Sequence, residues 1–221
     1  MKNIALSVKE FQHALLFVCT TTIFIGSLVG LARHFFSEGN MAQALFFGMI
    51  SSVSWAICIS IWAFRRPWTV ERIASWTGRP IIHGIWFGKL LTNYGVGDSE
   101  ESQSIPIAFV IRQTYIGYSL LSYTENQDSK TLVESLSIDQ QHQTIHLRYV
   151  YEFYIRKPDE RKLTTGTAEL NLIESGKRLK GHYFTNSPTQ GFAELTLVQR
   201  SCDGIDTFEA AKKLYEKISK V

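Results

Sequence analysis

Two long stretches without a charged residue constrain this chain more than any other feature. They cover residues 14–32 and 41–64. Each can cross a hydrocarbon layer of about 30 Å as a helix that rises about 1.5 Å per residue, whereas a surface helix of a soluble domain keeps a polar face. We therefore predict two transmembrane helices. The short segment between them, residues 33–40, predicts an antiparallel hairpin. A cleaved signal peptide is the alternative for the first stretch, but that stretch is long, no convincing cleavage site follows it, and a second span comes at once.

The positive charges around the two stretches predict their orientation. Lys2 and Lys9 precede the first span, and Arg65, Arg66 and Arg72 follow the second. By the positive-inside rule, both ends of the hairpin face the cytoplasm. The three cysteines suggest no disulfide framework, as expected for a reducing compartment. The prediction is a multi-pass membrane protein whose termini and following domain lie in the cytoplasm.

From residue 82 onward the pattern changes to alternation between apolar and polar residues. Turn residues separate the predicted strands, which cover residues 82–94, 106–124 (long enough to be bent or split), 131–138, 143–156, 165–174, 178–186 and 191–200. Such a run without intervening helices predicts an antiparallel meander, which hides its edges most easily by closing. The predicted fold is mainly β: residues 1–66 form the transmembrane hairpin, and residues 67–221 form a closed, eight-stranded, lipocalin-like barrel with a short C-terminal helix as a lid or plug.

The alternation also predicts which side chains face the barrel interior. In residues 143–156 the apolar and aromatic residues stand at odd positions, among them Tyr149 and Tyr151, and in residues 178–186 the same face carries Tyr183. An eight-stranded barrel either fills with side chains or holds one small ligand. The first strand carries Gly84, Trp86 and Gly88 on one face; we expect the glycines to allow a tight bend and the indole to close one end of the core.

Three motifs identify the chain as similar to a known family. They are "W-x-G-x-P-x-x-x-G-x-W-x-G" from Trp76 to Gly88, "F-V-I-R-Q-T" at Phe109–Thr114, and "G-x-Y-x-T-N-x-x-T-x-G" from Gly181 to Gly191. Together with two N-terminal spans, they resemble the two-transmembrane β-barrel effectors associated with SMODS nucleotidyltransferases in bacterial antiphage signalling (CBASS). The resemblance implies a receptor in the inner membrane whose barrel binds a cyclic dinucleotide made by a neighbouring nucleotidyltransferase. Its spans would then assemble into a homo-oligomer and disrupt the bilayer, which causes abortive infection.

A cyclic dinucleotide offers flat bases for stacking and phosphates for hydrogen-bond donors. Arg112, in an apolar strand, is the candidate phosphate contact, unless it faces solvent or forms an ion pair. Thr185, Asn186 and Thr189 are candidate polar contacts, although Asn-Ser-Pro is also ordinary turn chemistry. The candidate stacking residues, each of which would otherwise simply fill the barrel, are Trp86, Tyr115, Tyr149, Tyr151 and Tyr183.

Small residues recur every four positions in both spans. Gly26 and Gly30 follow Thr22 in the first span, and Gly48, Ser52 and Ala56 precede Ser60 in the second. Such stripes allow helices to pack closely in lipid. Two interpretations stay open: the stripes form an oligomerisation face, or they hold the two helices of one hairpin together.

Motifs for other chemistry are missing from the sequence. It has no H-E-x-x-H, G-x-S-x-G, Walker or G-x-G-x-x-G pattern, and its six histidines show no metal spacing. We therefore expect no enzyme, no metal and no cofactor. The nearly balanced charge predicts no DNA or RNA partner. Two alternatives remain: a membrane-tethered lipocalin-like barrel that binds a lipid or other apolar molecule without toxic output, and a structural membrane anchor for a partner enzyme.

Overall fold

The protein folds into two compact units. The computed structural model describes residues 3–4, 8–36, 40–93, 103–139, 141–142, 144–155, 164–187 and 189–219. The helical unit comprises Leu6–Arg66 together with Thr114–Ile116, and the second unit comprises Met1–Ala5, Pro67–Gln113 and Gly117–Val221. The short segment Thr114–Ile116 thus belongs with the helices although strands flank it in the sequence.

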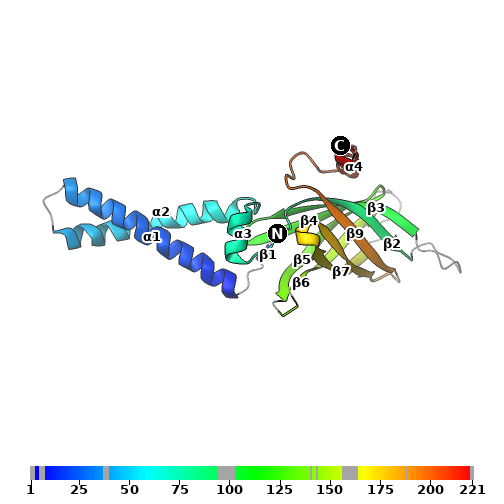
Figure 1. Ribbon diagram of the computed structural model, residues 1–221, viewed down its shortest axis with the longest axis horizontal. Coiled ribbons are helices and arrows are strands. Elements are labelled where there is room, and N and C mark those ends of the chain that lie inside the picture. Colours follow the sequence, from blue (N-terminus) through cyan, green and yellow to red (C-terminus); the bar gives the residue numbers. More distant parts are fainter. Residues whose placement is uncertain are drawn as a thin grey trace. The chain divides into compact units, whose positions relative to one another are not determined.

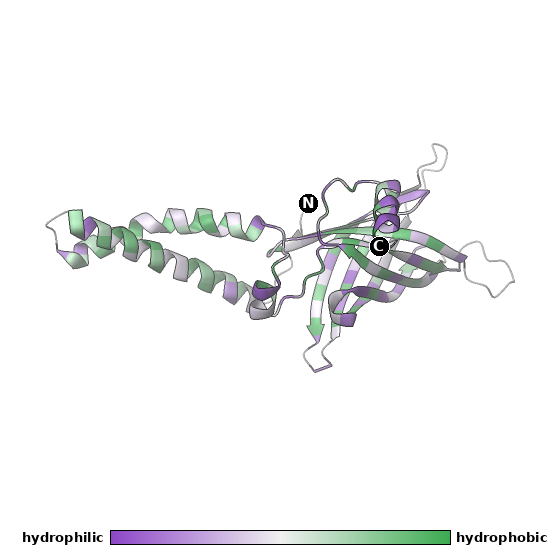
Figure 2. Ribbon diagram, turned by 45° about the horizontal axis from the view of Figure 1, so that its top comes forward, coloured by the Kyte–Doolittle hydropathy of each residue, from purple (hydrophilic) through white to green (hydrophobic). Residues whose placement is uncertain are grey.

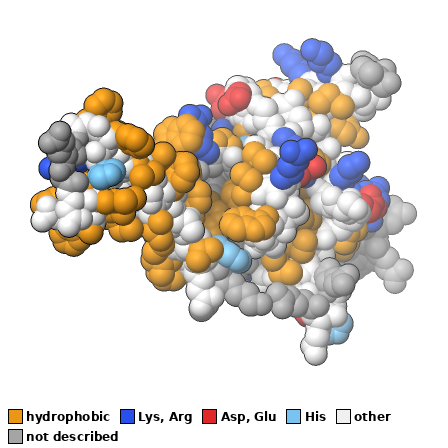
Figure 3. All heavy atoms as spheres, turned by 60° about the vertical axis from the view of Figure 1, so that its left-hand side comes forward, with side chains coloured by type: hydrophobic (Ala, Val, Ile, Leu, Met, Phe, Trp, Pro, Cys, Tyr) orange, Lys and Arg blue, Asp and Glu red, His pale blue; other side chains and the backbone are white. Residues whose placement is uncertain are grey.

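Two long apolar helices make up most of the helical unit. Helix α1 spans Val8–Phe36 and α2 spans Met41–Arg65. Hydrophobic residues predominate along both of them (Figure 2), and hydrophobic side chains lie on the face of the helices seen in Figure 3. Their stretches Phe11–Phe36 and Met41–Arg65 have mean hydropathies of 2.2 and 2.0 and are long enough to span a bilayer. The prediction of two long apolar helices is confirmed. The described residues hold only these two such helices, so the expectation of a multi-pass membrane protein extends no further than this one pair.

The small residues pack where α1 meets α2. A Cβ atom on Gly48 would lie 2.5 Å from the carbonyl oxygen of Gly26 and 2.6 Å from the amide nitrogen of Gly30, so a side chain does not fit there. Ser52 donates its hydroxyl proton to the carbonyl oxygen of Thr22 on the other helix, at 3.0 Å. Ala56 is fully buried. These residues therefore hold the two helices of one chain together, and an oligomerisation role for this face stays a prediction.

The second unit is a closed antiparallel sheet (Figure 1). Its strands are β1 (Asn3–Ile4), β2 (Gly84–Thr92), β3 (Gln103–Gln113), β4 (Gly117–Tyr123), β5 (Gln127–Asp139), β6 (Thr144–Ile155), β7 (Thr164–Ile173), β8 (Arg178–Thr185) and β9 (Gln190–Gln199). Strands β2 to β9 follow one another around the barrel, β9 pairs with β2, and β4 pairs with β5. Strand β1 adds a two-residue pairing to β4. The eight-stranded barrel predicted from the sequence is confirmed.

The strand boundaries differ from the predicted ones at several positions. The long segment predicted at residues 106–124 is split into β3 and β4 around Thr114–Ile116, and β5 begins at Gln127 rather than at residue 131. The end of the first predicted strand, Tyr94, lies outside the described residues. Two short helical elements were not predicted: helix α3, Glu71–Thr77, and the 3₁₀ turn η1, Glu174–Gly176. Both are too short to produce a recognisable periodicity.

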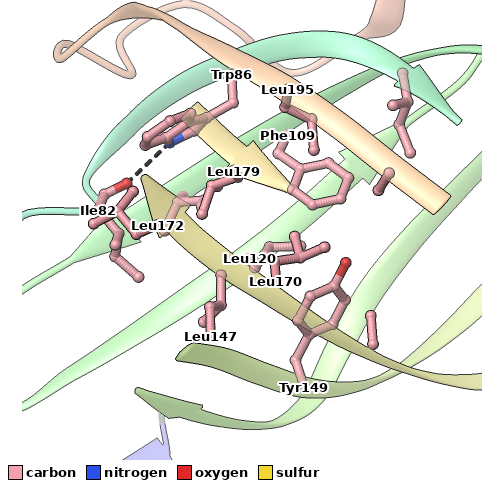
Figure 4. Packing of buried hydrophobic residues seen from close by; sticks show 14 of the residues in the cluster. Ile82, Trp86, Phe109, Leu120, Leu147, Tyr149, Leu170, Leu172, Leu179 and Leu195 are labelled. Atoms are coloured by element: carbon pink, nitrogen blue, oxygen red, sulfur yellow. Dashed lines mark hydrogen bonds between the residues drawn. The ribbon is translucent and has the colours of Figure 1, made fainter. Parts of the chain in front are cut away.

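Trp86 closes one end of the barrel core. Its ring is fully buried, and its Nε1 donates a hydrogen bond to the carbonyl oxygen of Ile82 at 3.0 Å. Figure 4 shows Trp86 and Tyr149 on opposite sides of the apolar cluster. A Cβ atom on Gly88 would lie 2.7 Å from the Cα of Leu195, so β2 and β9 can approach this closely only at a glycine. Gly84 has a φ of +142°, which favours glycine, and a bulge follows it.

Helix α4, Phe208–Ser219, covers the outer wall of the barrel (Figure 1). Phe208 and Tyr215 both stack on Phe87 of β2, with ring centroids 6.0 and 4.5 Å apart. This explains why Phe87, which points away from the barrel interior, is nevertheless buried. The predicted amphipathic helix is present, but it packs on the side of the barrel and plugs neither end.

A buried histidine joins the C-terminal segment to the barrel. The Nδ1 atom of His83 accepts a hydrogen bond from the amide of Gln113 at 3.0 Å, and its Nε2 atom lies 3.7 Å from the sulfur of Cys202. Arg200 donates to the carbonyl oxygen of His83 at 3.0 Å. Burial, together with the positive charges of Arg200 and Arg112, lowers the pKa of His83 below its ordinary value. The neutral ring is therefore the form that the fold accommodates.

This network predicts a loss of stability in acid. Because the pKa of His83 is lower in the folded chain than in the unfolded chain, where it is about 6.5, the stabilising contribution is complete above that pH and is lost as the pH falls below it. We expect the thermal midpoint of the barrel to fall between pH 7.5 and pH 5. The variant His83→Gln, which cannot become charged, should lose part of this dependence. Identical pH profiles for the two proteins would contradict the prediction.

Candidate ligand cavity

The barrel contains a cavity of about 1030 Å³ at one end. The walls come from the C-terminal ends of β2, β4, β6 and β8 and from the N-terminal ends of β3, β5, β7 and β9. This is the end of the barrel opposite to the one that Trp86 closes, and Trp86 does not line the cavity. Cavities of this size hold drug-sized and somewhat larger ligands. Because the barrel core fills only part of the interior, the fold leaves room for one bound molecule.

Aromatic side chains of β6 form one wall of the cavity. Tyr149 and Tyr151 lie with ring centroids 5.6 Å apart, and Phe153 continues the row 6.4 Å beyond Tyr151. Phe109 of β3 meets Tyr149 edge to face at 6.2 Å. These residues share one face because alternate residues of a strand point to the same side of the sheet. The row offers flat apolar surfaces on which a planar ring system can stack.

Two glycines allow the rings of Tyr151 and Tyr183 to lie against the sheet. Tyr151 lies over its cross-strand neighbour Gly166, where an added Cβ atom would be 2.5 Å from the phenol oxygen. Tyr183 lies over Gly191 in the same way, with its Cε1 and phenol oxygen 2.8 Å from the position of such an atom. Covering a strand glycine with an aromatic ring protects the exposed backbone and fixes the ring. The glycines thus determine where the rings lie in the cavity.

The phenol groups in the cavity stay neutral. Burial raises the pKa of Tyr149, of Tyr151 and of Tyr183. A neighbouring phenol adds to the effect for Tyr149 and Tyr151, while a hydrogen bond with Thr92 partly offsets it for Tyr183. Each hydroxyl therefore keeps its proton at physiological pH and can donate a hydrogen bond to an acceptor on a ligand.

The hairpin that joins β4 to β5 supplies most of the polar lining. The hydroxyls of Ser122 and Ser129 are hydrogen-bonded at 2.6 Å, and the turn closes with the amide of Thr124 donating to the carbonyl oxygen of Gln127 at 2.8 Å. Glu125 and Asp128 add two carboxylates. Among the lining residues that the structure describes there is no lysine or arginine. Recognition by these residues therefore relies on hydroxyl, phenol, amide and carboxylate groups.

Five of the nine predicted ligand contacts line this cavity. Tyr149, Tyr151 and Tyr183 do so from β6 and β8. Thr185, the last residue of β8, and Thr189, in the connection between β8 and β9, also line it, and the hydroxyl of Thr185 donates to the carbonyl oxygens of Ser187 and Thr189. The structure brings these five together although they come from two separate segments of the sequence.

The other four predicted contacts lie elsewhere. Trp86 is buried in the opposite half of the core, and Arg112 is exposed on the outer wall because it occupies an outward position of β3. Tyr115 belongs to the helical unit, where it stacks on Phe64 of α2 with centroids 5.0 Å apart. Asn186 accepts a hydrogen bond from the amide of Thr165 through its side chain, which is turn chemistry. None of these four residues lines the cavity, and a role for them in ligand binding stays a prediction.

Sequence analysis missed the polar hairpin between β4 and β5. It assigned residues 125–128 only to a break between strands. The available signal was the density of side-chain donors and acceptors in this region, "SYTENQDS". The alternation pattern shows which residues lie on strands and on which face. It does not show which turns between strands lie at the open end of the barrel, because that depends on how the barrel closes.

The cavity and fold define a class of protein: a small-molecule-binding antiparallel barrel that follows a pair of long apolar helices. Residues 77–199 match the family described as Cap15, cyclic dinucleotide receptor domain. The chain belongs to this family, which confirms the resemblance to the two-transmembrane CBASS effectors. Comparison with curated proteins finds no match. Across the described ranges, no group of three or more His, Cys, Asp or Glu residues is arranged to hold a metal ion.

Proposed function

We propose that this protein is a membrane-anchored receptor for a cyclic dinucleotide and an effector of antiphage immunity. The observation that carries the proposal is a barrel cavity, lined by aromatic rings and neutral donors, within the segment that matches the receptor family. Helices α1 and α2 anchor the barrel in the bacterial inner membrane, with the barrel in the cytoplasm. Ligand binding then drives assembly of the hairpins, disruption of the membrane and abortive infection. The ligand comes from an associated nucleotidyltransferase.

The chemistry of the cavity suits the parts of such a ligand. The bases stack on Tyr149 and Tyr151, for which about 1–3 kcal/mol per base is the usual scale. The phosphates accept hydrogen bonds from neutral hydroxyl and phenol groups rather than from Arg112, which faces outward. Glu125 and Asp128 at the mouth accept hydrogen bonds from base N–H or ribose hydroxyl groups. The polar groups of this hairpin favour a ligand that carries polar groups of its own over a wholly apolar one.

A titration with the full chain tests the proposal. The protein, purified in lipid nanodiscs, is heated with a panel of cyclic dinucleotides that differ in their bases, with the matching linear dinucleotides and with a fatty acid. We expect a rise in the thermal midpoint with one cyclic member at micromolar concentration and none with its linear counterpart. In vesicles loaded with a self-quenching dye, the same ligand should release the dye. Stabilisation by the fatty acid alone would favour the lipocalin-like alternative.

The glycine beneath Tyr151 provides a sensitive check on the ring geometry. In Gly166→Ala the new methyl group collides with the phenol of Tyr151, so this ring must move away from the sheet. We expect the affinity for the cyclic dinucleotide to fall by about tenfold, which corresponds to about 1.4 kcal/mol. Thr167→Ala, on the outer face of the same strand, is the matched control and should leave the affinity unchanged. Equal affinities for the two variants, measured by calorimetry, would argue against a stacking role for Tyr151.

A further inference from the structure

Helix α3 presents two different faces. On one side Glu71, Ala74 and Ser75 line a second cavity, of about 750 Å³, between this helix and the barrel end at which β7 finishes. On the other side the apolar residues are exposed: Val70, just before the helix, is 50% exposed, Ile73 is 45% exposed and Trp76 is 65% exposed. Residues on either side of the helix attach it to the barrel: the amide of Trp68 donates to the carbonyl oxygen of Gln113 at 2.8 Å, and the side-chain amide of Gln113 donates to the carbonyl oxygen of Pro80 at 2.9 Å. The helix thus turns one side toward the barrel and an apolar surface away from it.

The position of α3 in the chain limits what can cover this surface. Only residues 66–70 separate the end of α2, at Arg65, from the start of α3, at Glu71. Even fully extended, this connection reaches only about 20 Å. With 25 residues, α2 is about 37 Å long, which exceeds a hydrocarbon core of about 30 Å, so its end lies among the headgroups when it spans a bilayer. The apolar face of α3 is thus held within reach of the membrane surface.

The composition around α3 fits a membrane interface. Tryptophan favours this zone because its ring is amphipathic. Arg72 is exposed on α3, and Arg65 and Arg66 precede it, so cationic groups flank the apolar residues as in helices that lie on anionic membranes. The guanidinium of Arg66 lies over the ring of Trp62, 4.3 Å from its centroid. This arginine and aromatic pair at the end of α2 is typical of the boundary between lipid and water.

We propose that α3 is an interfacial helix that inserts Val70, Ile73 and Trp76 between the lipid headgroups while its opposite face is turned toward the barrel. The proposal rests on the proposed insertion of α1 and α2 in the membrane. Its partner is the bilayer surface, with anionic headgroups that meet Arg65, Arg66 and Arg72. The barrel end next to α3 would then be restrained at the membrane surface by a second contact, in addition to the covalent connection.

Fluorescence quenching in vesicles tests the location of α3. The full chain, with Cys19, Cys58 and Cys202 replaced, carries one cysteine at position 76, 57 or 167 that is labelled with an environment-sensitive fluorophore. It is reconstituted in vesicles of phosphatidylethanolamine and phosphatidylglycerol at a 3:1 ratio. Nitroxides are placed either near the headgroup or deep in the acyl chain. We expect the label at position 76 to be quenched by the shallow nitroxide, the label at 57 by the deep one, and the label at 167, on the outer barrel wall, by neither.

The outcomes separate this proposal from the proposed membrane anchoring. If the label at 57 is quenched but the label at 76 behaves like the one at 167, the helix does not lie in the interface and the proposal is wrong. If the label at 57 is not quenched, the anchoring itself fails and the proposal fails with it.

In the chain labelled at 76, Ile73→Glu should reduce shallow quenching severalfold, whereas Thr167→Glu should leave it unchanged. Because both positions are exposed, neither change should unfold the protein. Equal quenching in the two variants would also overturn the proposal.

Discussion

Tyr151→Ala should weaken binding of the cyclic dinucleotide by about 5- to 150-fold, the equivalent of about 1–3 kcal/mol for one stacked base. The ring of Tyr151 stands between those of Tyr149 and Phe153 on the cavity wall, so its removal interrupts the row of aromatic surfaces. Calorimetric titration of the full chain in nanodiscs measures the effect. Tyr151→Phe keeps the stacking surface and loses only the phenol donor, so it should lose much less affinity.

A ring on the outer face of the barrel controls for nonspecific effects of such a truncation. Phe184 of β8 is 53% exposed and does not line the cavity. Phe184→Ala should therefore bind the ligand as tightly as the unmodified protein. If Tyr151→Ala and Phe184→Ala bind equally well, the aromatic wall of the cavity is not a stacking platform.

Gly48→Leu should abolish toxicity while leaving ligand binding intact. Even a methyl group at this position would press against the backbone of Gly26 and Gly30, so a leucine must force α1 and α2 apart. Overpacking of this kind costs about 1–3 kcal/mol or more, and in lipid close packing is the main force that joins helices. Dye release from vesicles and survival of expressing cells report the output, while calorimetry reports binding in the barrel.

Ser51→Leu is the matched control for that variant. Ser51 lies on the exposed side of α2 and makes only a hydrogen bond to the carbonyl oxygen of Phe47 in the preceding turn. A leucine there adds apolar surface without entering the helix interface, so toxicity should persist. Full toxicity in Gly48→Leu would contradict a role for the close packing of the hairpin in the output.

The architecture was predictable because its signals repeat along the chain. Uncharged stretches of about 20 residues indicate spans, and alternation over residues 143–156 indicates both the strand and its inner face. Helix α3 was not predictable in this way, because seven residues give less than two full turns of pattern. The side of the barrel on which α4 packs depends on the tertiary contact between Phe87 and Tyr215, which no local pattern encodes.

The site was predictable only in part, for a related reason. Tyr149, Tyr151 and Tyr183 were found because they lie on strands whose inward face could be identified. The sequence left Arg112 open between a phosphate contact, an ion pair and a solvent-facing position, because β3 is apolar on both faces. Its outer face is partly covered by α4 and the C-terminal segment, and Arg112 is exposed on that face. The class of ligand was inferred from the family resemblance, and the presence of a cavity was inferred from the predicted closed barrel.

Photocrosslinking tests the central claim most directly. A cyclic dinucleotide that stabilises the full chain is prepared with an azide on one base, irradiated with the protein in nanodiscs, and the labelled peptides are identified by mass spectrometry. The account predicts labels on β6, at Tyr149 to Phe153, and on the hairpin between β4 and β5, with competition by the unmodified ligand. Competed labelling confined to the outer wall around Arg112, or to the helices, would contradict it.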